Sequence, residues 1–555
     1  MRVPALLLFA ALANPASAAD YYGTTEPFAS EAVYFVLTDR FVDGDASNNH
    51  ANQGGANRTF DRPLQTPTGV PDNIGYLGGD FKGLLDNAGY ISEMGFTALW
   101  ITPIVDNPDE AFAGGFRIGE AFFADRGKTG YHGYWGVNFY RVDEHLESQE
   151  LSFADLALQL RGKHGLKLVL DVVGNHGSPS YTMPVDQPKF GEIYDAAGAL
   201  VADHQNLRPE QLDPKNPLHR WFHREPDLAE LSNFDDTNPA VLDYLADAYL
   251  QWIGQGAAAF RIDTIKHMPH AFWKKFSDRI RAQYPGFFMF GESFEYDARK
   301  IAAHTWPANG AISVLDFPLR QQLVDVFEKP GSDYALVASA LHLDDGVYQN
   351  PYELMTFYDN HDMARMKASD DGFIDAHHWL FTARGIPVVY YGSEIAFMAG
   401  AKEHEGNRNY FGPQNIALAR GHRIRAALQR IGRIRAASPA LQRGLQVNLE
   451  LRGDRASFLR VYEKDRVAQT ALVLLNKGDA PARFTVARLL GAGEWRDADS
   501  GETFAVARGE AASAGIAATV APHGARVLLL DARNDNAELQ KELARLMKAT
   551  FPRGT

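Results

Sequence analysis

The segment Leu166-Lys-Leu-Val-Leu-Asp-Val-Val-Gly-Asn-His176 combines an apolar run with polar residues at its end. Such a run of apolar and β-branched side chains is typical of a strand that is buried on both faces, as in a parallel sheet. Similar runs recur along the chain, at Ala32–Leu37, Ala98–Ile104, Ala258–Ile262, Phe287–Phe290, Ala311–Leu315, Leu354–Phe357 and Val388–Tyr391. The sequence therefore offers eight strand candidates.

Stretches with helical spacing of apolar residues separate these strands. They are Leu151–His164, Asn238–Ile253, Pro269–Ala282 and Ile374–Arg384. Eight alternating strand and helix units over roughly 400 residues predict an α/β protein with a parallel (β/α)8 TIM barrel. An open, doubly wound sheet is the alternative, because strand order cannot be read from a sequence.

Two parts of the chain depart from this alternation. The connection from Val173 to Asn238 is rich in Pro, His, Asn and Asp and is longer than a plain loop needs. We expect an inserted domain B after strand 3, at residues 177–235, within a barrel domain at residues 20–440.

After the helical stretch Ile416–Ala437, alternating runs predict a C-terminal antiparallel β-sandwich domain C at residues 441–532. These runs are Ala456–Glu463, Val467–Asn476, Ala482–Val486 and Ala525–Asp531. A charged amphipathic helix, Asn534–Lys548, falls in a tail at residues 533–555 and is interpreted as a solvated appendage.

Composition limits the chemistry. The 555 residues are 45% hydrophobic and 22% charged, which excludes a disordered chain. A formal charge of −14 argues against a nucleic-acid partner, because phosphate binding needs a basic surface. With no cysteine, the chain has no thiol nucleophile, disulfide or thiolate metal site. Carboxylates, imidazoles, hydroxyls and hard cations remain.

The N-terminus has the pattern of a secretory signal peptide at residues 1–19. Arg2 precedes the apolar run Ala5–Ala13, and Pro15 precedes the small residues Ala16-Ser-Ala18. A buried N-terminal helix is the alternative interpretation. We expect an exported protein, extracellular or periplasmic, that is a monomer and has no membrane anchor.

Ionisable residues follow several of the predicted strands. In a TIM barrel the catalytic groups lie at the carboxyl ends of the strands, where loops from different strands meet. This predicts that Asp263, Glu292 and Asp362 surround one pocket. Arg261 lies on the same face of its strand as Asp263 and favours the ionised carboxylate, whereas a setting between Phe290 and Phe294 favours a protonated Glu292. A nucleophile and an acid are what glycoside hydrolysis with retention requires. A metal site built from the same carboxylates is the competing hypothesis.

Taken in order, these segments resemble the conserved regions of the α-amylase family of glycoside hydrolases (family 13), and the resemblance covers most of the chain. Four segments resemble bacterial α-amylases and cyclodextrin glucanotransferases most closely. They are Val33-Tyr-Phe-Val-Leu-Thr-Asp-Arg-Phe-Val-Asp-Gly-Asp-Ala-Ser-Asn-Asn49, Gly78-Gly-Asp-Phe-Lys-Gly83, Tyr131-His-Gly-Tyr-Trp135 and Asn360-His-Asp-Met-Ala-Arg365. The resemblance implies the barrel, domain B and domain C.

The resemblance also implies roles for individual residues. It makes Asp263 the nucleophile, Glu292 the general acid/base and Asp362 the stabiliser of the transition state. The residues that it implies for substrate binding are His132, Tyr134, Asp171, His176, Arg261, Lys266, His267, His361 and Arg408.

Calcium is the expected cofactor. Asp43, Asp45, Asn48 and Asn49 crowd oxygen donors into one loop, with Asp80 and the Gly78 carbonyl nearby in sequence. Such oxygens suit Ca²⁺, although a solvated turn would have a similar composition. The same side chains resemble a calcium site of the glucanotransferase type. A second site, also implied by the resemblance, would use Asn175, the His267 carbonyl and Glu230, which stands where the family pattern has aspartate.

Three functions remain open at this point. The first is an α-1,4-glucan hydrolase acting on starch and maltooligosaccharides, and the second is a transglycosylase. A hydrolase of cyclodextrins is a variant of the first. Pro226, at a position where glucanotransferases have an aromatic residue, and a chain that ends soon after domain C favour the hydrolase. The third is a glucan-binding protein without activity, which the presence of all three carboxylates disfavours.

Overall fold

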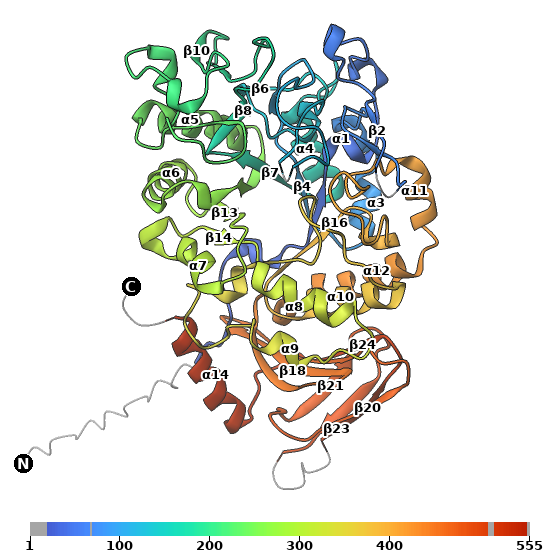
Figure 1. Ribbon diagram of the computed structural model, residues 1–555. Coiled ribbons are helices and arrows are strands. Elements are labelled where there is room, and N and C mark those ends of the chain that lie inside the picture. Colours follow the sequence, from blue (N-terminus) through green and yellow to red (C-terminus); the bar gives the residue numbers. More distant parts are fainter. Residues whose placement is uncertain (1–18, 67–68, 122, 509–514, 552–555) are drawn as a thin grey trace, which may run out of the picture.

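The computed structural model describes residues 19–66, 69–121, 123–508 and 515–551 (Figure 1). Of the predicted signal peptide, all but Ala19 lies outside these residues. Within them, no helix has both the length and the apolar character that a membrane crossing requires.

Eight parallel strands close into a barrel. They pair in chain order: β1 (Val33–Val36), β4 (Ala98–Ile101), β7 (Lys167–Val173), β12 (Ala257–Asp263), β13 (Phe288–Gly291), β14 (Ser313–Val314), β15 (Met355–Thr356) and β16 (Ile386–Tyr390). β16 pairs with β1, and Leu315, directly after β14, forms a parallel bridge with Met355 of β15. These two contacts confirm the TIM barrel and rule out the open sheet. Each predicted strand matches one of the eight within a few residues.

Helices surround the barrel and cover its apolar strands. They are α1 (Thr38–Phe41), α2 (Phe81–Asp86), α3 (Ala88–Glu93), α4 (Phe153–His164), α5 (Pro239–Gly254), α6 (His270–Gln283), α7 (Ala298–Ala302), α8 (Phe317–Phe327), α9 (Ala335–Ala338), α10 (Asp370–Thr382), α11 (Gly412–Ala419), α12 (Arg423–Ala436) and α13 (Pro439–Arg443). Local signals fix their ends. In α4, Ser152 and Asp155 form a capping box, and Gly165 ends the helix with a φ of 67°. The expected helical stretch Ile416–Ala437 is two helices, because His422 caps α12.

The connection between β7 and α5 folds as a small domain of short strands. β8 (His176–Pro179) pairs with β11 (Leu231–Asn233), and β9 (Glu192–Tyr194) pairs with β10 (Leu200–Asp203). A separate apolar cluster of Phe112, Trp135, Met183, Phe190 and Leu231 lies where this domain meets the loop after β4. The inserted domain B therefore borders the carboxyl ends of the barrel strands.

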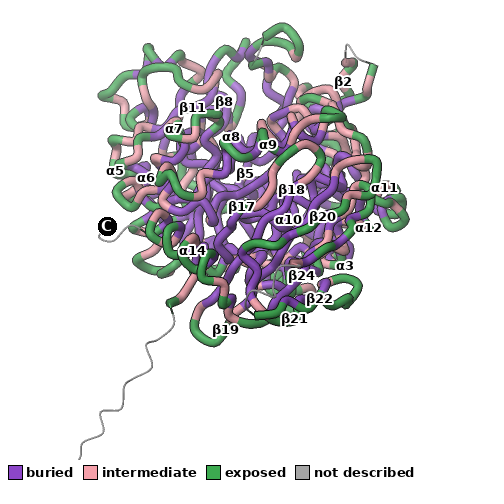
Figure 2. Tube along the Cα trace, turned by 90° about the horizontal axis from the view of Figure 1, so that it is seen from below, coloured by how far each residue is buried: buried purple, intermediate pink, exposed green. Residues whose placement is uncertain are grey.

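An antiparallel β-sandwich follows the barrel. A larger sheet has the order β17 (Leu445–Arg452), β18 (Arg455–Lys464), β19 (Val467–Asn476), β24 (Gly524–Leu530), β21 (Gly493–Asp497) and β22 (Thr503–Val506). A second sheet pairs β20 (Ala482–Val486) with β23 (Ile516–Val520). The antiparallel domain predicted for the C-terminal region is confirmed. Figure 2 shows buried residues running continuously through the interior, with exposed residues at the rim.

The C-terminal helix α14 (Ala537–Thr550) corrects one expectation. It is not a solvated appendage, because Leu539, Leu543 and Leu546 are buried in the core of domain C. These leucines lie on one face of the helix, so the apolar stripe packs while the charged face stays in water. Figure 1 shows the helix lying against the edge of the sandwich.

The first described residues lie against domain C rather than against the barrel alone. Tyr21 forms an antiparallel bridge with Glu463 of β18. Arg533, 513 positions after Asp20, forms an ion pair with it at 3.2 Å. Tyr22 packs its ring against Phe551 beyond α14. The two ends of the described chain therefore meet on one side of the molecule.

Candidate active site

One arginine joins the carboxylates that the strands bring together. Arg261 on β12 is fully buried, and its Nη1 donates to Asp263 Oδ1 at 2.8 Å. The same nitrogen donates to both oxygens of Asp171, at 2.8 and 2.9 Å, and Nη2 lies 2.9 Å from Glu292 Oε2. The side chains come from three neighbouring strands, β7, β12 and β13. The guanidinium occupies the centre at which a metal shared by these carboxylates would lie.

Asp171 is held firmly in this group. Its Oδ2 accepts hydrogen bonds from Tyr134 Oη at 2.9 Å and from Trp100 Nε1 at 3.1 Å. Burial raises the pKa of Asp171 to about 7, although Arg261 opposes the shift. The contacts make Asp171 a support for Arg261 and Tyr134 rather than a group that faces substrate.

Glu292 has the environment of an acid. Burial raises the pKa of Glu292 to about 8; the neighbouring carboxylates Asp362, Asp263 and Asp171 add to the rise, and Arg261 opposes it. A carboxyl group with such a pKa is largely protonated at neutral pH. The expected protonated Glu292 therefore has a structural basis, and Arg261 contacts both Glu292 and Asp263 rather than Asp263 alone.

Asp362 lies across the pocket, after β15. Its Oδ1 accepts a hydrogen bond from Arg408 Nη2 at 2.6 Å, and its Oδ2 lies 3.1 Å from His361 Nε2. About a third of the side chain is exposed (31%). The partial burial raises the pKa of Asp362, and Arg408 opposes that shift. Arg408 thus fixes one carboxylate oxygen and leaves the group open to the pocket.

The remaining predicted binding residues fall into two groups. Tyr134 stacks on His361 at 5.3 Å and lies beside His132, whose Nδ1 accepts from the Tyr134 amide. Burial lowers the pKa of His132, His176 and His361, so these imidazoles are neutral.

The second group consists of Lys266 and His267. Lys266 Nζ donates to the Phe294 carbonyl at 2.9 Å, and His267 Nδ1 lies 3.1 Å from Asp227. Lys266 and His267 therefore contact residues other than Tyr134 and its neighbour His361.

Two oxygens of the first predicted calcium loop have no hydrogen-bond partner in the part of the chain that the structure describes. They are the buried acceptors Asn48 Oδ1 and Asn49 Oδ1. A Cβ on Gly78 would collide with Asn49 Oδ1 and Asp43 Oδ2, so these two oxygens converge on the glycine. Asp80 accepts from the amides of Gly44, Asp45 and Gly83, and burial raises its pKa to about 6. Asp45 instead turns its carboxylate to Ser47. Unsatisfied carbonyl oxygens beside a carboxylate fit a hard cation.

The second predicted calcium site is not assembled in the same way. The Glu230 carboxylate accepts from Thr182 and lies against Gly115. Asn175 Oδ1 is engaged by Thr264 Oγ1 and lies 2.9 Å from His176 Nδ1. The acidic side chain that contacts His267 is Asp227. Because Glu230 is one methylene longer than aspartate, its carboxylate extends beyond the place beside His267 and reaches Thr182.

Among the described residues, three further groups of acidic and histidine side chains could each hold a cation. They are Asp143, Glu144 and His145; His223, Asp235 and Asp236; and Asp106, Asp109 and Glu144. No sequence pattern indicated them, since each group combines residues that also occur in ordinary ion pairs. Lys189 lies 3.3 Å from Asp106 and 3.1 Å from Asp109, so an ammonium already balances one of the groups.

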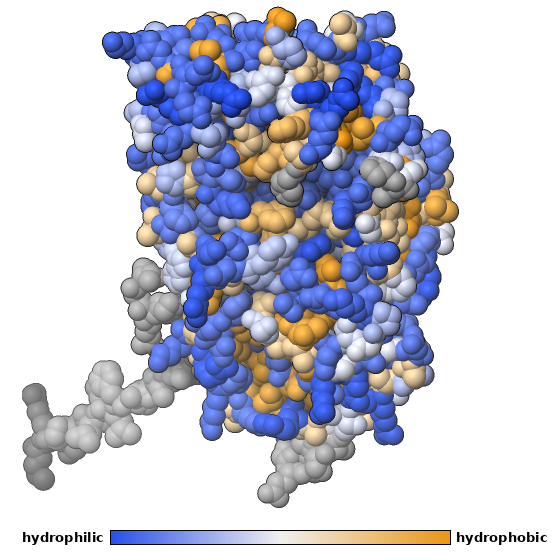
Figure 3. All heavy atoms as spheres, in the orientation of Figure 1, coloured by the Kyte–Doolittle hydropathy of each residue, from blue (hydrophilic) through white to orange (hydrophobic). Residues whose placement is uncertain are grey.

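A cavity of about 210 Å³ adjoins Asp362 on the side of Tyr134. Its wall contains ion-paired residues that the sequence analysis missed: Asp125, Lys128, Glu403 and His404. Lys128 and Glu403 belong to loops after different strands and are 3.6 Å apart, a proximity that no sequence motif encodes. Figure 3 shows a mainly hydrophilic surface on which hydrophobic residues gather in patches across the middle of the face.

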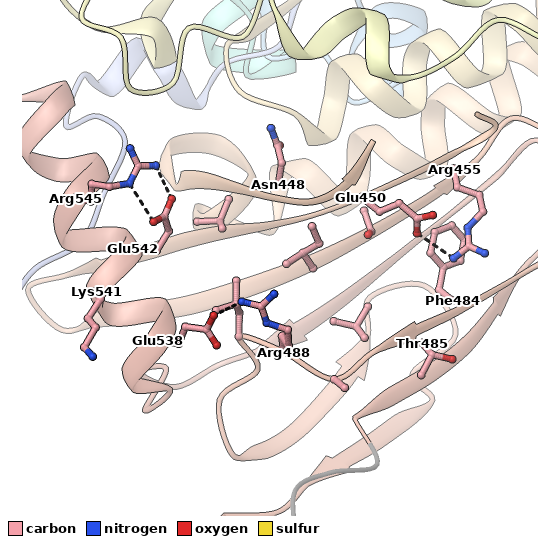
Figure 4. A pocket seen from close by; sticks show the side chains of 16 residues that line it. Asn448, Glu450, Arg455, Phe484, Thr485, Arg488, Glu538, Lys541, Glu542 and Arg545 are labelled. Atoms are coloured by element: carbon pink, nitrogen blue, oxygen red, sulfur yellow. Dashed lines mark hydrogen bonds and ion pairs between the residues drawn. The ribbon is translucent and has the colours of Figure 1, made fainter. Parts of the chain in front are cut away.

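A larger groove lies elsewhere, between α14 and the sheets of domain C (Figure 4). Its volume is about 880 Å³, and its rim carries the ion pairs Arg488–Glu538, Arg455–Glu450 and Arg545–Glu542. The floor is apolar and none of the strand-end carboxylates reaches it. By volume alone, this groove would be chosen as the functional site. The clustered carboxylates instead identify the pocket around Arg261 as the candidate active site.

Comparison with known proteins identifies the family. Residues 35–429 match the family model described as "Alpha amylase, catalytic domain". The cyclomaltodextrin glucanotransferase of Klebsiella oxytoca is 29% identical over 513 residues, covering 82% of this chain and 71% of that enzyme. The α-amylase of Niallia circulans is 28% identical over 502 residues, covering 86% of this chain and 87% of that protein. The chain spans 59% of the Bacillus licheniformis glucanotransferase.

Two solved structures share the whole described architecture. The crystal structure of an Anoxybacillus α-amylase has a TM-score of 0.69 and 25% identity, covering 91% of this chain and 99% of that one. A cyclomaltodextrin glucanotransferase "with a three-domain ABC distribution" has a TM-score of 0.73 and 29% identity, covering 90% and 99%. The second match means that three domains do not distinguish a hydrolase from a glucanotransferase.

The chain has a barrel with one inserted and one appended domain, and carboxylates at the strand ends surround one arginine. Together these features define the fold of a glycoside hydrolase that acts on α-glucans. The chain belongs to the α-amylase family. It is an enzyme of the type that includes α-amylases and cyclomaltodextrin glucanotransferases.

Proposed function

We propose that the protein is a retaining α-1,4-glucan hydrolase that cleaves starch-like polysaccharides and maltooligosaccharides. The observation that carries the proposal is the contact of one guanidinium, that of Arg261, with both Asp263 and Glu292. A guanidinium shared by the two carboxyl groups holds both on one side of the pocket, in keeping with the close pair that a double displacement requires.

The first half of the reaction forms a covalent intermediate. Asp263 attacks the anomeric carbon of the sugar at the cleavage point while Glu292 gives its proton to the departing glycosidic oxygen. The raised pKa of Glu292 supports this assignment, because an acid must hold its proton until the bond breaks. The Arg261 contact supports an ionised Asp263.

The second half releases the product. Glu292, now ionised, takes a proton from water, and the water oxygen displaces Asp263 from the anomeric carbon. Asp362 is assigned to the positive charge that develops on the sugar ring in both steps. Tyr134 supplies the stacking surface under that sugar, and His361 and His176 supply neutral hydrogen-bonding groups. Lys266 and His267 serve the side of the leaving group.

Calcium belongs to the proposed enzyme as a structural cofactor. Asp43, Asn48, Asn49 and the Gly78 carbonyl would hold one ion, and its charge would satisfy the orphaned amide oxygens. A second ion at Asn175 and the His267 carbonyl would draw its carboxylate from Asp227 rather than from Glu230. We further propose that the protein is exported, to the periplasm or the medium, and acts as a monomer without a membrane anchor.

Transglycosylation is the second candidate, because a sugar hydroxyl can replace water in the second step. Phe294 and Tyr296 are exposed by 37% and 42% just after Glu292, and such rings can hold an acceptor sugar. Pro226, which has no aromatic ring, favours the hydrolase.

A time course of products from amylose and from a cyclodextrin, resolved by chain length, tests the proposal. Linear products shorter than the substrate are expected. Cyclic products, or oligosaccharides longer than the donor, would overturn the hydrolase assignment in favour of transfer. An unchanged mixture would overturn both.

A further inference from the structure

The wall of the cavity beside Asp362 contains a chain of alternating charges. Arg408 contacts Asp362 at 2.6 Å through Nη2 and Glu403 at 3.0 Å through Nη1. Glu403 lies 3.6 Å from Lys128, and Lys128 lies 2.6 Å from Asp125. The charges therefore run from the transition-state carboxylate along the wall of a cavity that Glu292, the group assigned to the leaving oxygen, does not line. This places the cavity on the donor side of the proposed cleavage point.

Lys128 is unusual for a lysine because only 9% of its side chain is exposed. Burial opposes its charge, but Asp125 and Glu403 raise its pKa, so the ammonium group is retained. An ammonium has three N–H donors, and the ion pairs of Lys128 with described residues are one contact each, to Asp125 Oδ1 and to Glu403 Oε1, so a donor remains for a ligand. Lys128 also lines the cavity, together with His132 and Tyr134. A fixed, charged donor therefore borders the space.

The position of the cavity relates Lys128 to a particular sugar. Tyr134 and Asp362, which are assigned to the sugar at the cleavage point, both line the cavity. Three ion pairs, through Arg408 and Glu403, lead from Asp362 to Lys128. A second glucose unit on the donor side would thus bring its hydroxyl groups to Lys128, while the first unit would not reach it.

We propose that Lys128 is a specificity-determining residue that donates a hydrogen bond to the second glucose unit on the donor side. The proposal rests on the proposed function, since it names the sugar that one wall of that site recognises. Asp125 and Glu403 hold the ammonium in place, so little side-chain entropy is lost when the sugar binds. The interaction selects donors with at least two units over single glucose units.

Two donors with the same leaving group separate this role from a structural one. α-Glucosyl fluoride fills only the place at the cleavage point, whereas α-maltosyl fluoride also fills the place beside Lys128. Fluoride release gives kcat/KM for each. For Lys128→Met we expect kcat/KM for maltosyl fluoride to fall about 10- to 100-fold, the loss of one charged hydrogen bond. The value for glucosyl fluoride should stay within about twofold, and Lys128→Arg should recover much of the loss.

Lys402→Met is the matched control, because Lys402 is exposed on the segment that carries Glu403 and does not line the cavity. It should alter neither donor. Equal losses with both fluorides, or no loss with maltosyl fluoride, would overturn the inference while the wild-type enzyme still releases fluoride. Wild-type protein that consumes neither the fluorides nor maltoheptaose would overturn the proposed function, and this inference with it.

Discussion

His523 in the turn between β23 and β24 lies 2.8 Å from Asp375 on barrel helix α10, Nδ1 to Oδ2. Its Nε2 is 3.1 Å from Asp479 and 4.0 Å from Asp371. Lys477 and Arg423 are the nearby cations, facing Asp375 and Asp371 respectively. One imidazole of domain C therefore meets two carboxylates of the barrel, those of Asp375 and Asp371, while Asp479 belongs to domain C itself.

This contact predicts that stability falls as the solution becomes alkaline. Burial opposes the charge of His523, but its bonds to Asp375 and Asp479 raise its pKa. Burial raises the pKa of Asp375 to about 7. A histidine with a raised pKa contributes stability that is complete below pH 6.5 and is lost as the pH passes through the higher folded value. The raised pKa of Asp375 works in the same direction, because ionising the buried acid also costs stability.

Thermal melts at pH 6 and pH 9 check this expectation. His523→Ala should lower the free energy of unfolding by about 1.5–3 kcal/mol at pH 6 and by less at pH 9. His164→Ala on the outer helix α4 serves as the control. An equal effect of His523→Ala at both pH values would contradict the role of the charge.

Glu292→Gln should reduce kcat on maltooligosaccharides by about 10²- to 10⁴-fold, because the variant has no proton to give to the leaving oxygen. The shape of the site is retained, so calorimetric titration should give a dissociation constant close to that of the wild type. Glu295→Gln, three residues away and paired with Lys300, should have nearly full activity. Undiminished activity of the Glu292 variant would indicate that another group is the acid.

The pH profile of kcat/KM should keep its alkaline limb near pH 8. Glu292 must be protonated to act, and its pKa is raised to about 8, so activity is retained until the pH passes this value. Initial rates on maltoheptaose between pH 4 and pH 10 measure the limb. A decline that begins near pH 5 would show that Glu292 ionises as an ordinary glutamate.

Removing calcium should lower the unfolding temperature. An ion that binds only the folded state contributes about 2.7 kcal/mol at 100 times its dissociation constant. Scanning calorimetry with a chelator and with added Ca²⁺ gives the difference. Asp43→Asn should abolish the Ca²⁺-dependent rise, whereas Asp86→Asn on the exposed side of α2 should keep it. A rise of the same size in both variants would place the ion elsewhere.

Leu543→Ala on α14 should cost about 2–5 kcal/mol of stability, the usual effect of a cavity in a packed core. Lys541→Ala, on the solvent side of the same helix, should change stability by less than about 0.5 kcal/mol. Urea titration followed by circular dichroism measures both. A neutral effect of Leu543→Ala would restore the view of α14 as a solvated appendage.

Much of the fold could be read from the sequence because its signals are local. Runs such as Leu166–Val173 are mainly apolar, as expected of a strand that is buried on both faces, so the existence of the strands and their positions along the chain were predictable, whereas their order in the sheet was not. Asp263, Glu292 and Asp362 could be placed together because a barrel brings strand ends to one side. The amphipathic stripe of α14 was visible, but the surface that covers it was not.

Other features depend on contacts between distant segments. Lys128 meets Glu403 across two loops, and neither residue stands in a recognisable pattern. Glu230 was the predicted acidic residue of the second calcium site, but Asp227 contacts His267. This difference depends on the length of one side chain and on the path of domain B. Arg261 was predicted beside Asp263, but its equal contact with Asp171 and Glu292 required the geometry of three strands.

The meeting of the chain ends on domain C has a consequence for how the molecule assembles. Asp20 pairs with a residue 513 positions later, and β1 must find β16 before the barrel closes. Contacts of such sequence separation are costly to form early and slow to find. The N-terminal strand therefore cannot reach its final place while a ribosome still holds the last third of the chain. We expect an open, partly formed barrel to persist until synthesis ends, with a need for protection from aggregation during that interval.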